Sequence, residues 1–237
     1  VVINCSAMSN VDACEEDPDA AERINAEGPA HLAEICRREG IRLIHFSTDY
    51  VFDGEKQGEY DEADSPAPVN LYGWSKLRGE LAVLETLVEA VVLRVSFVFG
   101  PGRPTFLDKI ADQLRQSDQT VRVFDGWISR PTCSLEIAQV VERILESELT
   151  GVWHLANPPA GSRADFAREL ARIVGADPAR VVGTDPAAVD LPARRPASTP
   201  LATTRLEAAL GWTPRDWRQW AAEYLGAGSA AAGGDLR

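Results

Sequence analysis

The sequence lacks an apolar run that approaches the roughly 18 residues needed to span a bilayer, and no secretory signal pattern opens it. Basic residues are few, with lysine only at Lys56, Lys76 and Lys109, and the net charge is −12. Such an acidic surface disfavours non-specific binding to nucleic acid or to anionic membranes. We therefore expect a cytoplasmic protein with no nucleic-acid or membrane partner.

Cysteine and histidine are too scattered to suggest a metal site. The cysteines are Cys5, Cys14, Cys36 and Cys133, and the histidines are His31, His45 and His154. No C-x-x-C pair occurs, and no histidine lies at zinc-ligand spacing from a cysteine. We expect free thiols in a reducing compartment and no bound metal.

The apolar pattern predicts an α/β fold. Strands are expected over 1–5, 41–46 and 90–99, and helices over 19–40 and 72–89, with a loop around Asp12 to Asp17. This alternation predicts a doubly wound, parallel, Rossmann-type sheet. The chain begins at Val1 and its one methionine is Met8, so we expect further sequence upstream.

A smaller mixed lobe is expected after residue 102. It combines helices at 105–116, 134–147, 163–174, 204–210 and 217–225 with strands at 120–124 and 151–156, and the stretch 177–200 is expected to be mostly loop. We assign 1–102 to a nucleotide-binding domain and 103–226 mainly to a substrate-binding lobe with segments that return to the first domain. Residues 227–237 are rich in glycine and alanine, and we expect a flexible tail.

The strongest chemical signal is Tyr72 followed by Lys76. Residues four apart on a helix share one face, and an ammonium group near a phenol favours the phenolate, which lowers the tyrosine pKa. A tyrosine tuned in this way can give a proton to a ketone oxygen. The alternative is a surface Tyr–Lys pair on an amphipathic helix.

Thr48 strengthens the catalytic interpretation, because it stands at the carboxyl end of a predicted strand. Ligands of open α/β sheets bind at that edge, where a hydroxyl can position a substrate carbonyl. An ordinary turn or helix cap is the simpler alternative for Thr48. Together, the three side chains indicate reduction of a carbonyl by a nicotinamide cofactor, which carries the hydride.

Two strings, S-T-D-Y-V-F-D-G at 47–54 and Y-G-W-S-K at 72–76, resemble the dTDP-4-dehydrorhamnose reductase family, a branch of the extended short-chain dehydrogenases/reductases. Shorter matches, from 4–7 through 131–132 to 195–196, extend the similarity over most of the chain. The resemblance implies NAD(P)H-dependent reduction of a nucleotide-sugar 4-ketone, in a protein that can form a homodimer.

The resemblance also implies a role for individual residues. Thr48, Tyr72 and Lys76 would be catalytic, with Tyr72 as proton donor and Lys76 on the nicotinamide ribose. The cofactor site would include Asn4, Ser6 and Ala7, in addition to Tyr72 and Lys76. The substrate site would include Thr48, Asp49, Tyr50, Phe97, Pro131 and Thr132.

The sequence departs from the family pattern at three places. The family's glycine-rich G-x-x-G-x-x-G turn, which holds the cofactor pyrophosphate, does not occur. We expect the first strands and this turn upstream, and the choice between NADP and NAD goes with them; the alternative is a degenerate domain that lacks the turn. Phe97 stands where the family often has tryptophan, which affects the sugar preference. Trp127 and Arg130 come shortly before Pro131 and Thr132. Either they belong to a loop with a buried tryptophan, or they contact the base and diphosphate of the substrate.

Two other functions fit the same fold. The regulatory β subunit of methionine adenosyltransferase has a similar sequence around 47–76 and acts by binding a partner, with the dinucleotide as a structural ligand. An epimerase or dehydratase would keep the fold and change the chemistry. A dehydratase usually has an acidic pair after the threonine, whereas here Asp49 is followed by Tyr50.

Overall fold

The computed structural model describes residues 1–102 and 104–227. The tail predicted at 227–237 lies outside these residues from position 228 onward. Within the described residues, no helix combines the length and the apolar character that crossing a membrane requires.

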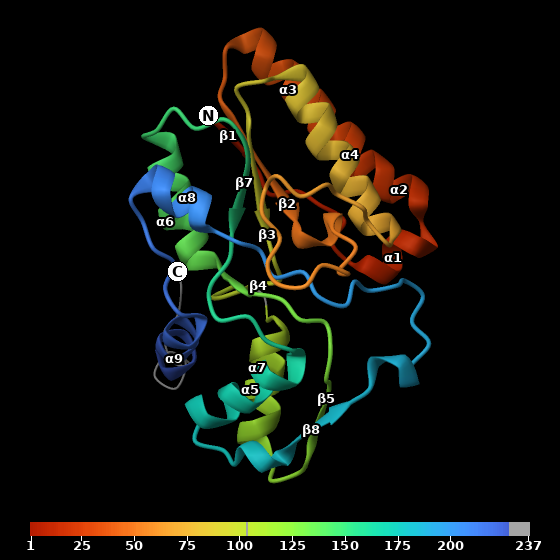
Figure 1. Cartoon of the computed structure of the whole chain (residues 1–237), viewed down its shortest axis with the longest axis vertical. Coiled ribbons are helices and arrows are strands. Elements are labelled where there is room, and N and C mark those ends of the chain that lie inside the picture. Colours follow the sequence, from red (N-terminus) through yellow and green to blue (C-terminus); the bar gives the residue numbers. More distant parts are fainter. Residues whose placement is uncertain (103, 228–237) are drawn as a thin grey trace, which may run out of the picture.

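A parallel sheet of four strands forms the centre of the upper part of the molecule in Figure 1. Its strands, in spatial order, are β1 (Val2–Asn4), β2 (Leu43–Thr48), β3 (Val91–Val95) and β7 (Gly151–Leu155). Every neighbouring pair is parallel, and Thr48 is in register with Val95. The predicted α/β class with a parallel sheet is confirmed.

Helices cover both faces of this sheet, as the doubly wound prediction requires. One face packs against α3 (Gly28–Glu39) and α4 (Leu71–Thr86) through a core that includes Val83 and Val92. The other face packs against α6 (Ser134–Leu145) and α8 (Thr204–Leu210) through a core that includes Leu93 and Leu206. Figure 1 shows the two helix pairs on opposite sides of the strands.

The segment before α3 contains more helix than the sequence pattern indicated. The loop expected around Asp12 to Asp17 is instead largely α1 (Val11–Glu16), because the Asn10 side chain accepts hydrogen bonds from the first backbone amides. α2 (Pro18–Glu22) and a π-helical turn (Arg23–Glu27) then lead into α3.

A second group of elements lies below the sheet in Figure 1. It contains α5 (Phe106–Gln116), β5 (Val121–Phe124), α7 (Arg163–Ile173), β8 (Val181–Thr184) and α9 (Trp217–Ala227). β5 and β8 form a separate two-stranded parallel sheet. The stretch 177–200, expected to be mostly loop, also contains β8, a strand flanked by 3-10 turns at Pro178–Arg180 and Pro186–Ala188.

This second group has its own apolar core. Leu107, Phe166 and Trp217 are among the most deeply buried side chains in it. Short strands β4 (Val98–Phe99) and β6 (Thr132–Cys133) pair with each other where the chain passes between the two groups. These separate cores support our proposal of a division near residue 102, with 134–155 and 204–210 returning to the central sheet.

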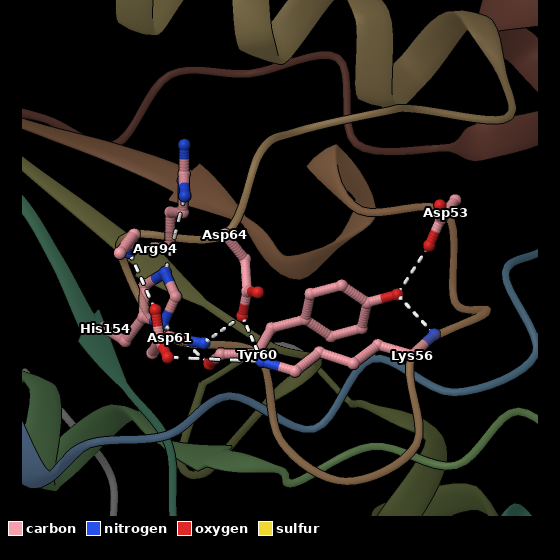
Figure 2. A network of polar contacts seen from close by, with 8 residues as sticks. Asp53, Lys56, Tyr60, Asp61, Asp64, Arg94 and His154 are labelled. Atoms are coloured by element: carbon pink, nitrogen blue, oxygen red, sulfur yellow. Dashed lines mark hydrogen bonds and ion pairs between the residues drawn. The ribbon is translucent and has the colours of Figure 1, made fainter.

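The polar network drawn in Figure 2 holds the loop after β2 against the sheet. The Tyr60 ring stacks on Phe52 at 4.2 Å, and its hydroxyl donates to Asp53. The Tyr60 carbonyl oxygen lies 3.2 Å from His154 Nδ1, while His154 Nε2 lies 3.4 Å from Arg94 Nη1. The histidine is therefore neutral with its proton on Nδ1, and burial lowers its pKa to about 3.

Candidate active site

The end of β2 and the beginning of α4 bring Thr48 and Tyr72 together. β2 ends at Thr48, whose hydroxyl oxygen accepts a hydrogen bond from Tyr50 N at 3.2 Å and starts a 3-10 turn over Asp49–Val51. α4 begins after Asn70, whose side chain accepts from Gly73 N at 2.8 Å. A Cβ on residue 73 would lie 2.2 Å from Tyr50 O, so only glycine allows α4 to approach this turn so closely.

Burial, more than Lys76, controls the acidity of Tyr72. Removal from water raises the pKa of its phenol, and the nearby Thr48 side chain opposes this only in part. Lys76 itself is 2 % exposed, and its Nζ donates to Phe46 O at 2.7 Å. The expectation that Lys76 lowers the Tyr72 pKa is thus not met in this structure, and Tyr72 remains a protonated phenol at neutral pH.

Lys76 is held in an unusual electrostatic setting. Burial lowers the pKa of its ammonium group to about 8, and the Glu80 carboxylate one turn further along α4 acts in the opposite direction. Glu80 is itself paired with the buried Arg94, whose Nε and Nη2 donate to its two oxygens at 2.9 and 2.6 Å. The ion pair leaves little of the Glu80 charge to compensate Lys76.

Asp49 is the centre of a set of hydroxyl groups. Its Oδ1 accepts from Thr48 Oγ1 at 3.2 Å, and its Oδ2 accepts from Ser96 and Thr199 hydroxyls at 2.8 and 2.6 Å. Burial raises the pKa of this carboxyl, and the hydroxyl donors counteract part of that rise. Asp49 therefore fixes the orientation of the Thr48 side chain.

These residues border a cavity of about 620 Å³, a size typical of small-molecule sites. Of the predicted site residues, Thr48, Asp49, Tyr50, Tyr72 and Phe97 line it. The Tyr50 and Tyr72 rings meet edge to face at 5.8 Å. Three buried polar atoms without a hydrogen-bond partner among the described residues belong to lining residues, namely Ser47 Oγ, Ser129 Oγ and Arg163 Nη1. Unsatisfied buried groups of this kind are rare and require an explanation.

The other predicted site residues lie away from this cavity. Asn4 Nδ2 donates to His45 Nδ1 at 3.0 Å, and Asn4 Oδ1 accepts from Ser6 N. Ser6 and Ala7 are exposed just beyond β1. Pro131 and Thr132 are buried beneath the cavity, where Thr132 Oγ1 accepts from Ser96 N and donates to Leu155 O. Their roles toward cofactor and substrate stay predictions.

The structure places Trp127 and Arg130 in different surroundings. Trp127 lines the cavity and packs against Phe124 at 4.7 Å. Arg130 is buried and points elsewhere, since its Nη1 donates to Glu59 and to Leu201 O at 2.9 and 3.0 Å. Of the two, only Trp127 is placed to meet a ligand in this cavity.

The sequence analysis missed Arg163, the one basic residue among the described lining residues. Arg163 is the first residue of α7, where the Ser162 hydroxyl caps the helix by accepting from Asp165 N at 3.1 Å. Its guanidinium lies 3.7 Å from the centre of the Phe97 ring. The sequence analysis placed a helix over 163–174, which begins with Arg163, but no sequence signal placed that helix beside β4.

The site and the fold together define a Rossmann-type protein with a Thr–Tyr–Lys set at the carboxyl edge of its sheet. The family model described as RmlD substrate binding domain matches residues 1–229. The chain belongs to this family.

Similar proteins include curated and solved relatives. A dTDP-4-dehydrorhamnose reductase of Mycobacterium tuberculosis is 38% identical over 243 residues, covering 100% of this chain and 80% of the relative. The crystal structure of a dTDP-4-dehydrorhamnose reductase from Clostridium acetobutylicum is 32% identical, covers 96% of this chain and 80% of its own, and has a TM-score of 0.90. A Bacillus anthracis structure of the same description, in complex with NADP, is 26% identical with a TM-score of 0.89 and covers 94% and 79%.

Proposed function

We propose that this protein reduces the 4-ketone of a nucleotide sugar, as a dTDP-4-dehydrorhamnose reductase does, with NADPH or NADH as the hydride donor. The observation that carries the proposal is that Thr48 and Tyr72 line the same cavity of about 620 Å³. The named relatives support the same substrate class.

The described residues fit the nicotinamide end of such a cofactor. Lys76 Nζ has three N–H donors, and its hydrogen bond to Phe46 O at 2.7 Å uses one. The remaining donors can hold ribose hydroxyls, and the exposed Ser6 and Ala7 can line the cofactor where β1 ends. The NADP complex of the Bacillus anthracis relative supports a nicotinamide cofactor.

When bound, the nicotinamide supplies the hydride that adds to the ketone carbon. Tyr72 donates its phenolic proton to the ketone oxygen, which becomes the hydroxyl of the product. The raised pKa of Tyr72 keeps that proton in place at neutral pH. Thr48 donates its hydroxyl proton to Asp49 Oδ1 in this structure, and turning that proton to the same ketone oxygen would orient the ketone for transfer.

Turnover by the full-length protein tests the proposal. NADPH oxidation would be followed with a dTDP-4-keto-6-deoxy sugar, and Tyr72→Phe run alongside. We expect the variant to lose at least 100-fold in kcat, on the order of the general acid contribution, with its fold and cofactor affinity retained. Undiminished activity of Tyr72→Phe would refute Tyr72 as the proton donor.

The regulatory-subunit alternative predicts a different result. Tight cofactor binding without turnover of this or related keto sugars would favour it and direct the search to a protein partner. The presence of Thr48, Tyr72 and Lys76 together favours the enzyme, because a structural dinucleotide site does not need a proton donor.

We also propose a cytoplasmic location and a homodimeric assembly. The four free cysteines support the first, since exposed Cys5 suits a reducing compartment. The second follows from the family resemblance and is tested by light scattering of the purified full-length protein.

A further inference from the structure

We propose that Arg163 binds the phosphoryl oxygens of the nucleoside diphosphate group carried by the substrate. This inference rests on the proposed function and deepens it, because it names the residue that recognises the charged part of a nucleotide sugar. None of the catalytic or cofactor roles assigned above involves Arg163.

Charge singles out Arg163 within the cavity. Among the described lining residues it is the only lysine, arginine or histidine, and Asp49 is the only carboxylate. Asp49 is already satisfied by hydroxyls of Thr48, Ser96 and Thr199. No ion pair joins it to Arg163 in the described structure, so the guanidinium charge faces the cavity without a directly bound counter-ion.

The hydrogen-bonding state of the guanidinium points the same way. Arg163 Nη1 is buried and has no partner among the described residues. A buried donor without a partner is costly, and the cost is recovered when a ligand oxygen accepts from it. Arg130, which sequence analysis considered for the diphosphate, has its own partners in Glu59 and Leu201 O.

Aromatic rings hold the guanidinium in a fixed orientation. Its carbon lies 3.7 Å from the Phe97 ring centre and 5.4 Å from the Phe106 ring centre. The two rings are perpendicular, 6.2 Å apart. A planar fork held in this way suits two oxygens of one phosphate, whereas a lysine ammonium would act only as a point charge.

The binding of dTDP, dTMP and thymidine by calorimetry, in the full-length protein with its cofactor, tests the inference. Arg163→Met keeps an unbranched side chain that can pack against Phe97, although a shorter one, and removes the charge. We expect it to weaken dTDP binding about 10- to 100-fold, as loss of a charged hydrogen bond implies, and to leave thymidine binding unchanged. The affinity of Arg163→Lys for dTDP should lie between those of Arg163→Met and the parent.

Arg168→Met provides the matched control, because Arg168 lies on the same helix and pairs on the surface with Asp165 at 3.1 Å. It should bind dTDP as the parent does. Equal weakening of dTDP and thymidine by Arg163→Met, unchanged dTDP binding, or no dTDP binding by the parent would each overturn the inference. Because binding is measured without turnover, failure here is distinct from failure of the reductase assay with Tyr72→Phe.

Discussion

Removal of the Lys76 charge should make the protein more stable and inactive. Burial lowers the pKa of this ammonium to about 8 from an ordinary 10.5. At 1.36 kcal/mol for each pKa unit, holding the charged form in the folded state costs about 3 kcal/mol. Lys76→Met avoids that cost and forfeits the hydrogen bond to Phe46 O, worth about 1 kcal/mol. We expect a net gain of about 2 kcal/mol in the free energy of unfolding at pH 7.

The gain should depend on pH in a defined direction. Below pH 8 the folded and unfolded chains both carry the charge, so the parent bears the full cost. Between pH 8 and 10.5 the folded chain gives up its proton first, and the stability of the parent rises with pH. The advantage of Lys76→Met should therefore shrink across this window.

Urea unfolding of the cofactor-free protein from pH 6 to 9.5 measures both effects. At pH 7 the midpoint of Lys76→Met should lie about 1 M above that of the parent. Lys109→Met is the control, since Lys109 is exposed and its loss should change stability by less than about 0.5 kcal/mol. A destabilised Lys76→Met, or an advantage that does not vary with pH, would refute the reasoning.

Two further predictions concern packing and acid stability. Gly73→Ala should cost about 1–3 kcal/mol of stability by overpacking and lower kcat, because the new Cβ would lie 2.2 Å from a carbonyl oxygen. Urea unfolding and steady-state kinetics measure the two effects. Gly226→Ala, which has open space around it, is the control and should be neutral. Burial lowers the pKa values of His45 and His154 to about 3 from 6.5. The contribution of these two histidines to the free energy of unfolding is therefore complete above pH 6.5 and is lost as the pH falls. In urea unfolding, stability should drop by up to about 2.7 kcal/mol between pH 6 and 5, and His45→Gln should halve that drop.

Local sequence pattern was enough for three of the four strands of the central sheet and for the positions of Thr48 and Tyr72 at its edge; the fourth strand, β7, was expected in the smaller lobe. Strand and helix periods depend on which faces are buried, and Thr48 and Tyr72 followed from their places at the end of a strand and the start of a helix. β8 was missed because its partner β5 lies far away in the sequence and prolines flank it, so its strand state depends on a tertiary contact.

Side-chain chemistry was less accessible from the sequence. The spacing of Tyr72 and Lys76 placed them on one helix face, but burial, which depends on the whole fold, raises the phenol pKa. Arg163 lies on a helix of the second group of elements, and its contact with Phe97 joins segments about 65 residues apart. Such a juxtaposition leaves no periodic signal in a single sequence.

The strand order has a consequence for biosynthesis. β3 ends at Val95, while its outer neighbour β7 begins only at Gly151. At translation rates of 5–20 residues per second, the ribosome needs about 3 to 11 seconds to add the intervening chain. Throughout that interval β3, with all five residues destined for burial, presents an unpaired edge of the kind that aggregates. Nascent chains that stall before residue 151 should therefore depend on chaperones.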